Sequence, residues 1–223
     1  MKKQAVMFDL DGTLINTLED LGDAVNMTLQ ERNLPQHPYA FFRHAVGDGA
    51  HMLITRSLPV NKRNPDTINE ARQVLREHYA NRWNVKTHPY DGILEMLNAL
   101  KARKAELAIL SNKPHPVTQK CVAQFLPQAL FSSIMGVLPD GPLKPDPAGA
   151  QTIITSTGIP KEAWLYVGDT NTDMQTATAT GLFAVGCTWG FRDRDELLIS
   201  GADAIINHPS ELLTLFDQSP SLP

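Results

Sequence analysis

Two aspartates separated by one residue follow a short apolar segment near the start of the chain, and this feature constrains the fold most strongly. Residues 5–8 are Ala-Val-Met-Phe, and Asp9-Leu10-Asp11-Gly12 follows directly. A short apolar run that ends in a glycine turn is typical of a strand buried on both faces of a parallel sheet. In such sheets, ligands bind outside the carboxyl ends of the strands. The pattern therefore places Asp9 and Asp11 where a binding site is expected.

Two other structures can contain the same four residues. An Asp-x-Asp-Gly segment is also a common polar turn, in which the acids have no chemical role. A calcium-binding loop that starts at Asp9 needs glycine at its sixth position, glutamate at its twelfth and a helix before it. The chain has Leu14 and Asp20 at those positions, after a segment with the pattern of a strand. The calcium loop is therefore excluded, whereas the simple turn is not.

Composition and charge narrow the class of protein. The 223 residues are 42% hydrophobic and 20% charged, which is typical of a globular domain that can carry a smaller second domain. The net charge of -4 provides no general attraction to nucleic acid or to an anionic membrane. Two cysteines, Cys121 and Cys187, are too few for a disulfide framework and suit a reducing compartment. We expect a cytoplasmic monomer or homodimer that binds neither nucleic acid nor membranes.

The periodicity of the apolar residues divides the chain into two parts. Residues 16–84 have helical patterns only, and helices are predicted at 18–32, 39–44, 49–57 and 65–83. Farther along, strands are predicted at 107–110, 133–137, 164–167, 183–185 and 204–206, and helices at 93–100, 117–124, 148–156 and 173–180. Alternating strands and helices indicate a parallel sheet with helices on both faces. We therefore predict an α/β fold, with a doubly wound, Rossmann-like core (1–15 and 85–223) and an inserted helical cap (16–84).

Two later strands also end in polar residues. Ser111 and Asn112 follow one predicted strand, and the hydroxyl and backbone N–H groups there can hold phosphoryl oxygens. Asp169 and Asp173 follow another predicted strand. Taken alone, the first pair is consistent with an ordinary loop and the second with the acidic start of a helix. Lys144 lies in a predicted loop before a helix, where a lysine is usually only solvated.

Together these residues are the parts that phosphoryl transfer requires. Two carboxylates about 4 Å apart repel by on the order of 4 kcal/mol at an effective dielectric of about 20. A cluster of four such groups, those of Asp9, Asp11, Asp169 and Asp173, therefore needs a cation. Oxygen ligands favour Mg²⁺, and the seven histidines lack the spacing of a zinc site. Lys144 would neutralise both a nucleophilic carboxylate and an incoming phosphate.

In this order, the segments resemble the signature motifs of the haloacid dehalogenase superfamily of phosphohydrolases with an aspartate nucleophile. The matching segments are Asp9-Leu10-Asp11-Gly12-Thr13, Ser111-Asn112, Lys144 and Gly168-Asp169-x-x-x-Asp173. Within the superfamily the chain is most similar to the phosphoglycolate phosphatase subgroup. This similarity rests on Ser111-Asn112-Lys113-Pro114, Leu143-Lys144-Pro145-Asp146-Pro147, Gly168-Asp169-Thr170 and Thr188-Trp189-Gly190-Phe191. Ser111 stands where many members have threonine, and it keeps the hydroxyl group.

The resemblance implies a role for each matching residue. Asp9 would attack phosphorus and form an aspartyl phosphate, and Asp11 would act as general acid and base. Mg²⁺ would be held by Asp9, the backbone carbonyl of Asp11 and Asp169, with Asp173 in direct or water-mediated contact. Substrate phosphoryl oxygens would be bound by Thr13, Ser111, Asn112 and Lys144, and Lys144 would also be catalytic.

In the cap, Val46-Gly47-Asp48-Gly49 resembles the substrate-side loop of the subgroup. Arg43, Gly47, Asp48 and Gly49 are therefore candidates for contacts with the leaving group. The alternative is that the two glycines only shape a turn between helices and that Arg43 is a surface residue. A helical lid of this size favours a small substrate over a macromolecule.

We therefore expect a Mg²⁺-dependent phosphatase that hydrolyses a small phosphate monoester, which the resemblance suggests is 2-phosphoglycolate. Pyrophosphatases and sugar-phosphate phosphatases share much of this pattern. A phosphomutase on the same scaffold would return the phosphoryl group to a sugar instead of water. A phosphate-binding or Asp-phosphorylated regulatory module without hydrolysis is a further alternative, against which the presence of Asp11 and Lys144 argues.

Overall fold

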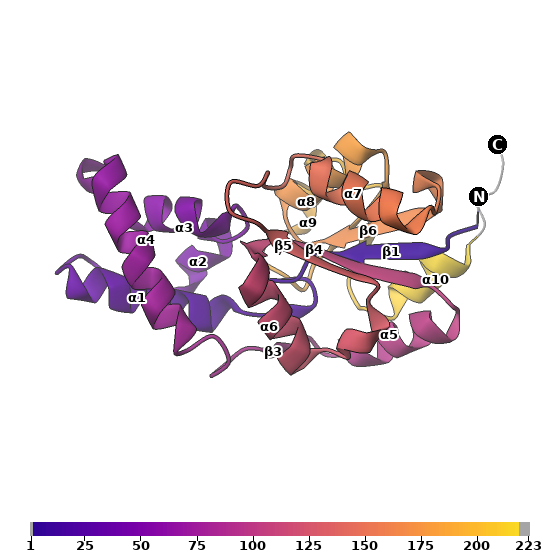
Figure 1. Cartoon of the computed structure of the whole chain (residues 1–223), viewed down its shortest axis with the longest axis horizontal. Helices are drawn as coiled ribbons and strands as arrows, with labels where there is room; N and C mark the ends of the chain where they lie inside the picture. The colour runs from indigo at the N-terminus through magenta and orange to yellow at the C-terminus, as the bar shows by residue number, and fades with distance from the viewer. Residues whose placement is uncertain (1, 219–223) are drawn as a thin grey trace. The chain divides into compact units, whose positions relative to one another are not determined.

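The computed structural model describes residues 2–218 and contains two compact units (Figure 1). One unit comprises residues 2–15 and 89–218 of the described chain, and the other is Asn16–His88. The connecting segments contain two short strands, β2 (Ile15–Asn16) and β3 (His88–Pro89), which pair with each other. Strands of two residues leave no periodicity in the sequence, so neither was predicted. Among residues 2–218, no helix combines the length and apolar character needed to cross a lipid bilayer.

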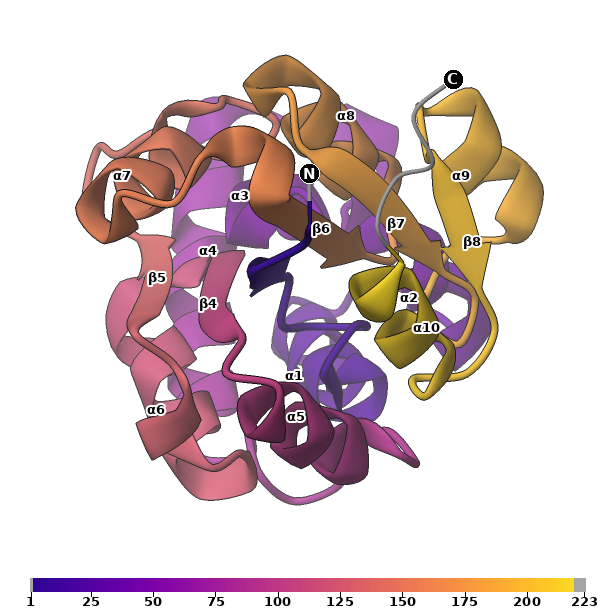
Figure 2. The same ribbon diagram turned by 90° about the vertical axis from the view of Figure 1, so that its right-hand side faces the viewer.

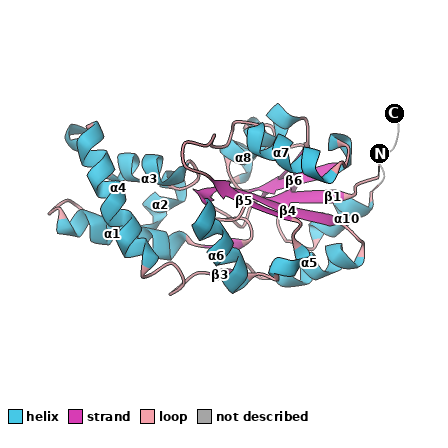
Figure 3. Ribbon diagram, in the orientation of Figure 1, coloured by secondary structure: helices cyan, strands magenta, loops and turns pink. Residues whose placement is uncertain are grey.

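A six-stranded parallel sheet forms the centre of the first unit (Figure 3). Its strands are β1 (Ala5–Phe8), β4 (Glu106–Pro114), β5 (Ser133–Val137), β6 (Trp164–Gly168), β7 (Phe183–Cys187) and β8 (Ala204–Ile206). Their order is β5-β4-β1-β6-β7-β8, so later strands lie on both sides of β1. The strand order therefore reverses at β1, and a ligand site is expected at its carboxyl end.

Helices cover both faces of this sheet (Figure 2). One face carries α5 (Ile93–Ala102), α6 (His115–Phe125) and α10 (Glu211–Asp217), and the other carries α7 (Ala148–Thr157), α8 (Asn171–Thr180) and α9 (Arg194–Ile199). Alternate strand residues such as Met7, Ala108 and Tyr166 pack against the second set of helices in one buried cluster. The predicted α/β architecture is thereby confirmed. The short helices α9 and α10 were not predicted because they contain too few turns to show an apolar period.

The register of β1 brings three chain segments to the same level of the sheet. Phe8 lies opposite Ile109 of β4 and opposite Val167 of β6. The residues that follow these three therefore meet at one edge. The strand predicted at 107–110 is longer than expected, because β4 continues through the polar residues to Pro114 while its register with β5 shifts.

The second unit is helical, as its pattern predicts. It contains α1 (Leu18–Glu31), α2 (Tyr39–Ala45), α3 (Gly49–Ser57), α4 (Pro65–Ala80) and a single turn at Val60–Lys62. The helix predicted at 65–83 ends three residues early, where the chain forms a turn. At the start of α1, the buried Asp20 carboxylate accepts hydrogen bonds from the backbone N–H groups of Lys86 and Thr87. This contact attaches α1 to the returning segment of the chain.

Candidate active site

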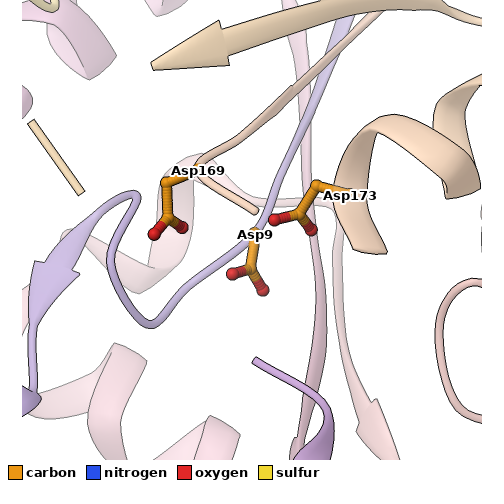
Figure 4. A group of neighbouring side chains, drawn as sticks. All are labelled: Asp9, Asp169 and Asp173. Atoms are coloured by element: carbon orange, nitrogen blue, oxygen red, sulfur yellow. The ribbon is translucent and has the colours of Figure 1, made fainter. Parts of the chain in front are cut away.

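Three buried carboxylates gather at the carboxyl edge of the sheet (Figure 4). Asp9 follows β1, Asp169 follows β6, and Asp173 lies in the first turn of α8. The ligand oxygens of these three residues all lie within 4.8 Å of one another. Asp9 is held at this edge because its backbone N–H donates to the carbonyl of Val167 on the neighbouring strand, at 2.9 Å. The group offers oxygen ligands only, as a hard divalent cation prefers.

Two glycines allow these carboxylates to lie so close to the backbone. Gly12 has φ +93°, and a Cβ atom there would lie 2.3 Å from Oδ2 of Asp169. A Cβ atom on Gly168 would lie 2.2 Å from the Cβ of Asp173. Both positions therefore require glycine, which explains the Asp-x-Asp-Gly and Gly-Asp segments in physical terms.

Asp169 is fixed by two hydrogen bonds. The Thr13 hydroxyl donates to Oδ1 at 2.8 Å, and the backbone N–H of Phe191 donates to Oδ2 at 2.8 Å. Burial and the neighbouring Asp173 raise the pKa of Asp169 to about 7, although these two donors oppose the rise. Thr13, expected to bind the phosphoryl group, is fully buried with its hydroxyl on Asp169. In this structure it orients a carboxylate.

Lys144 connects two of the carboxylates. Its Nζ donates to Oδ1 of Asp9 at 2.7 Å and to Oδ1 of Asp173 at 2.6 Å, and its side chain is only 4% exposed. Burial disfavours the charged form, but Asp173 and Asp9 raise the pKa of Lys144 well above its usual value. Burial also raises the pKa of Asp9 well above its usual range, and the Lys144 ammonium opposes that rise. The lysine therefore carries a positive charge between two acids.

Both oxygens of Asp173 accept hydrogen bonds from the protein. Oδ2 accepts from the backbone N–H and the hydroxyl of Thr170 at 3.1 and 2.7 Å, which caps the start of α8. Oδ1 accepts from the Tyr166 hydroxyl at 3.2 Å as well as from Lys144. The interpretation as an acidic helix start is thus also correct, because Asp173 caps α8 and orients Lys144 at the same time.

The amide of Asn112 clamps the Lys144 loop to β4. Its Oδ1 accepts from the backbone N–H of Lys144 at 2.8 Å, and its Nδ2 donates to the Lys144 carbonyl at 3.1 Å. The neighbouring Ser111 hydroxyl accepts from the backbone N–H of Lys113 at 3.2 Å. Contacts of Ser111 and Asn112 with phosphoryl oxygens stay a prediction, whereas the observed role of Asn112 is to position the lysine.

The side chain of Asp11 lies outside the group of three carboxylates. Its Oδ1 and Oδ2 accept hydrogen bonds from Nζ of Lys113, at 2.9 and 3.0 Å. When all four carboxyl groups are ionised, they face two ammonium groups, those of Lys113 and Lys144, and two negative charges remain in excess. One divalent cation would balance this excess, and the oxygen donors fit a hard ion such as Mg²⁺.

The chain matches the haloacid dehalogenase-like hydrolase family over residues 6–187. It belongs to this family. The chain is 33% identical to the phosphoglycolate phosphatase of Haemophilus influenzae (strain 86-028NP), over 93% of this chain and 96% of that protein. It is 34% identical to the phosphoglycolate phosphatase of Rhodospirillum rubrum, over 92% and 87% of the two chains. The chain is a phosphatase of this haloacid dehalogenase-like family, in which phosphatases generally use a divalent metal ion and act on small phosphate esters.

Solved structures of family members have the same fold along nearly the whole chain. A predicted phosphoglycolate phosphatase from Haemophilus somnus is 28% identical, with a TM-score of 0.89 over 96% of this chain and 98% of that one. A haloacid dehalogenase-like hydrolase from Streptococcus pneumoniae is 26% identical, with a TM-score of 0.87 over 96% and 98%.

The candidate residues of this hydrolase in the helical unit lie around the turn between α2 and α3. Arg43 is exposed near the end of α2, and Gly47 and Gly49 have φ values of +126° and +79°. Asp48 precedes α3 and forms an ion pair with Arg56. The positive φ angles explain the two glycines as turn residues. Contacts of this turn and of Arg43 with a leaving group stay a prediction.

Three features of the site had no predicted role. They are the Lys113 ammonium, the Tyr166 hydroxyl and the backbone N–H of Phe191. The only signal for Tyr166 was a polar group inside a predicted buried strand, and Lys113 lies just after another predicted strand, in a segment that was expected to be a loop. The Phe191 contact is made by the backbone, so no side-chain pattern could indicate it.

Proposed function

We propose that this chain is a Mg²⁺-dependent phosphatase that hydrolyses 2-phosphoglycolate to glycolate and phosphate through an aspartyl-phosphate intermediate. The observation that supports the chemistry best is the Lys144 ammonium between Asp9 and Asp173, with Asp169 beside them. The choice of substrate rests on the curated relatives, which are phosphoglycolate phosphatases and align with nearly the whole chain.

Asp9 is the proposed nucleophile. One of its carboxylate oxygens forms a bond to phosphorus while the bond from phosphorus to the glycolate oxygen breaks. A water molecule then attacks phosphorus and displaces Asp9, which releases phosphate and restores the carboxylate. Lys144 contacts Asp9 directly and stabilises the negative charge that the phosphoryl group brings into the site.

Asp11 is the proposed general acid and base. It donates a proton to the glycolate oxygen as the ester bond breaks, and it later takes a proton from the attacking water. Its position two residues after the nucleophile, in the turn that follows β1, supports this role. Its side chain lies outside the group of three carboxylates and accepts hydrogen bonds from Lys113 instead.

Mg²⁺ would be held by Asp9, the backbone carbonyl of Asp11 and Asp169. We assign Asp173 a water-mediated contact, because both of its oxygens already accept hydrogen bonds from Lys144, Thr170 and Tyr166. When bound, the ion supplies positive charge that offsets the repulsion between carboxylates and phosphoryl oxygens.

The remaining contacts complete the proposed substrate site. The Ser111 hydroxyl, nearby backbone N–H groups and Lys144 would bind phosphoryl oxygens, which fits their burial at the carboxyl edge of the sheet. Arg43 and the Gly47 to Gly49 turn are the proposed contacts of the glycolate carboxylate, as the positive charge of Arg43 suits an anionic leaving group.

The test is phosphate release from a panel of small phosphate esters that includes 2-phosphoglycolate, several sugar phosphates and pyrophosphate. Each is measured with Mg²⁺, with EDTA and with the isosteric Asp9→Asn variant as control. The proposal predicts the highest kcat/KM for 2-phosphoglycolate, loss of activity in EDTA and loss in the variant. A higher kcat/KM for another ester would contradict 2-phosphoglycolate as the substrate. An isomerised sugar phosphate formed without release of inorganic phosphate would indicate a mutase. Full activity in EDTA would contradict the need for Mg²⁺.

A further inference from the structure

Lys113 is a buried lysine for which the mechanism above has no use. Its side chain is 4% exposed, and its Nζ donates to both carboxylate oxygens of Asp11 at 2.9 and 3.0 Å. Burying an ammonium group is unfavourable unless an opposite charge compensates it, so the contact with Asp11 accounts for the position of this charge. The two residues are 102 positions apart in the chain, and β4 and the turn after β1 bring them together.

The backbone of Lys113 is fixed by its neighbours. Its carbonyl accepts a hydrogen bond from the Thr118 hydroxyl of α6 at 3.1 Å, and its N–H donates to Ser111 at 3.2 Å. On β5, a Cβ atom at Gly136 would lie 2.5 Å from the Lys113 carbonyl oxygen, so the two strands are in close contact there. The backbone of Lys113 is therefore held in place, and its nearly buried side chain reaches the Asp11 carboxylate.

A contact with both oxygens restricts how the Asp11 side chain can rotate. An aspartate in a polar turn has several rotamers, and only some of them direct an oxygen to the reacting group. The ammonium group has donors and no acceptor, so it cannot bind the O–H of a protonated carboxyl group. When Asp11 carries a proton, Lys113 can hold only its carbonyl oxygen, and the O–H is directed away from the lysine.

We propose that Lys113 is a positioning residue of the phosphatase, which holds Asp11 in the orientation for proton transfer to the leaving oxygen. This inference rests on the proposed function, in which Asp11 is the general acid and base. The proton passes from Asp11 to the oxygen whose bond to phosphorus breaks, while Lys113 keeps its own protons throughout. Lys113 therefore acts through Asp11.

The test compares two small substrates that differ in their need for a proton. The alkoxide released from 2-phosphoglycolate needs one, whereas the acetate released from acetyl phosphate does not. The parameter kcat/KM reports the step in which the leaving group departs. The variant Lys113→Met removes the charge at similar length, and Lys101→Met, at an exposed position of α5, is the matched control.

We expect Lys113→Met to lower kcat/KM for 2-phosphoglycolate by about 10²-fold, within the range for losing general acid catalysis, and for acetyl phosphate only several-fold. Asp11→Asn should show the same preference for acetyl phosphate. Combining the two substitutions should cause little further loss, because both remove one function. Lys113→Arg, which keeps the charge, should restore part of the activity on 2-phosphoglycolate, and Lys101→Met should behave as the parent enzyme.

Equal losses on both substrates would overturn the inference, because they would mean that Lys113 binds the phosphoryl group or supports the fold. Additive losses in the double variant would overturn it as well. If Lys113→Met does not fold, the comparison of Lys113→Arg and Lys113→Gln on the two substrates decides in the same way. If Asp11→Asn lowers kcat/KM equally for both substrates, the proposed role of Asp11 as general acid is wrong. If Asp11→Asn prefers acetyl phosphate and the Lys113 variants do not, only the proposed role of Lys113 is wrong.

Discussion

Replacing Lys144 with methionine should destabilise the protein strongly, and the structure gives the magnitude. The Lys144 side chain is 4% exposed, and its ammonium group lies 2.7 Å from an Asp9 oxygen and 2.6 Å from an Asp173 oxygen. Methionine fills a similar volume but leaves these two buried acids without their cation. Removing one partner of a buried ion pair costs about 3–5 kcal/mol of the free energy of unfolding. We expect a loss of about 3 kcal/mol or more in EDTA.

The loss should depend on pH in a defined direction. Burial already raises the pKa of Asp169 to about 7 from 3.8, and burial also raises that of Asp9. An acid whose pKa is raised on folding binds protons more tightly in the folded state. Its contribution to the free energy of unfolding is therefore most favourable below the pKa that it has in the unfolded chain. This contribution is lost as the pH rises through the pKa that it has in the folded protein. Lys144→Met removes the cation that opposes the rise in the pKa of Asp9, so its defect should be smaller at low pH than above neutrality.

The assay is urea unfolding of the parent and the variant in EDTA, at about pH 5 and about pH 8. The variant should lose clearly more stability at the higher pH, and added Mg²⁺ should recover part of that loss. Lys161→Met, which removes an exposed lysine, is a control for general effects of losing positive charge. An equal difference between parent and variant at both pH values would contradict this prediction, because titration of the buried acids would then not be the source of the defect.

Two further predictions concern Asp169. Mg²⁺ should raise the melting temperature more at about pH 8 than at about pH 5, because protons compete with the ion for a carboxyl group whose pKa is about 7. Thermal unfolding checks this, and Asp169→Asn should abolish the increase; a shift independent of pH would contradict it. Thr13→Val removes the hydroxyl that holds Oδ1 of Asp169, so the Mg²⁺ concentration for half-maximal activity should rise by about 10- to 100-fold. Titrating the activity with Mg²⁺ measures this concentration, and Thr13→Ser should keep it near that of the parent. Equal values in the parent and both variants would contradict this prediction.

Much of the fold could be predicted because the strands are buried on both faces. Residues 5–8 and 164–167 form contiguous apolar runs, which only the interior of a parallel sheet accommodates, and the structure has β1 and β6 there. The polar segment after residue 110 was placed in a loop, but it continues as β4 to Pro114. Its residues are buried and form polar contacts, so their hydrophilic character did not indicate exposure.

The candidate site was less predictable than the fold, because its geometry depends on contacts between distant segments. The strand order explains why Asp9, Asp169 and Asp173 lie together. Ligands of such sheets bind outside the carboxyl ends of the strands, so this position was expected. The clamp between Asn112 and the backbone of Lys144 does not follow, since the amide could equally bind a phosphoryl oxygen. Side-chain identity shows what a residue can bind, whereas the packed chain determines what it does bind.

Gly12 is a residue that both the sequence pattern and the packed structure require. Gly12 was expected as part of a turn, and its positive φ agrees with that expectation. The lack of room for a Cβ atom beside the Asp169 carboxylate is an additional requirement that no turn preference contains. The sequence pattern therefore explained Gly12 by its turn conformation, whereas the lack of space beside Asp169 is visible only in the structure.

The proposed mechanism depends on phosphorylation of Asp9 during turnover. The most direct measurement is mass spectrometry of the peptide that contains Asp9, after acid quenching of the enzyme while it hydrolyses 2-phosphoglycolate with Mg²⁺. We expect a phosphoryl group on Asp9 that is lost on treatment with hydroxylamine, and no such adduct in Asp9→Asn. Rapid turnover with no phosphorylated Asp9, even when the quench is faster than a single turnover, would contradict the proposed mechanism.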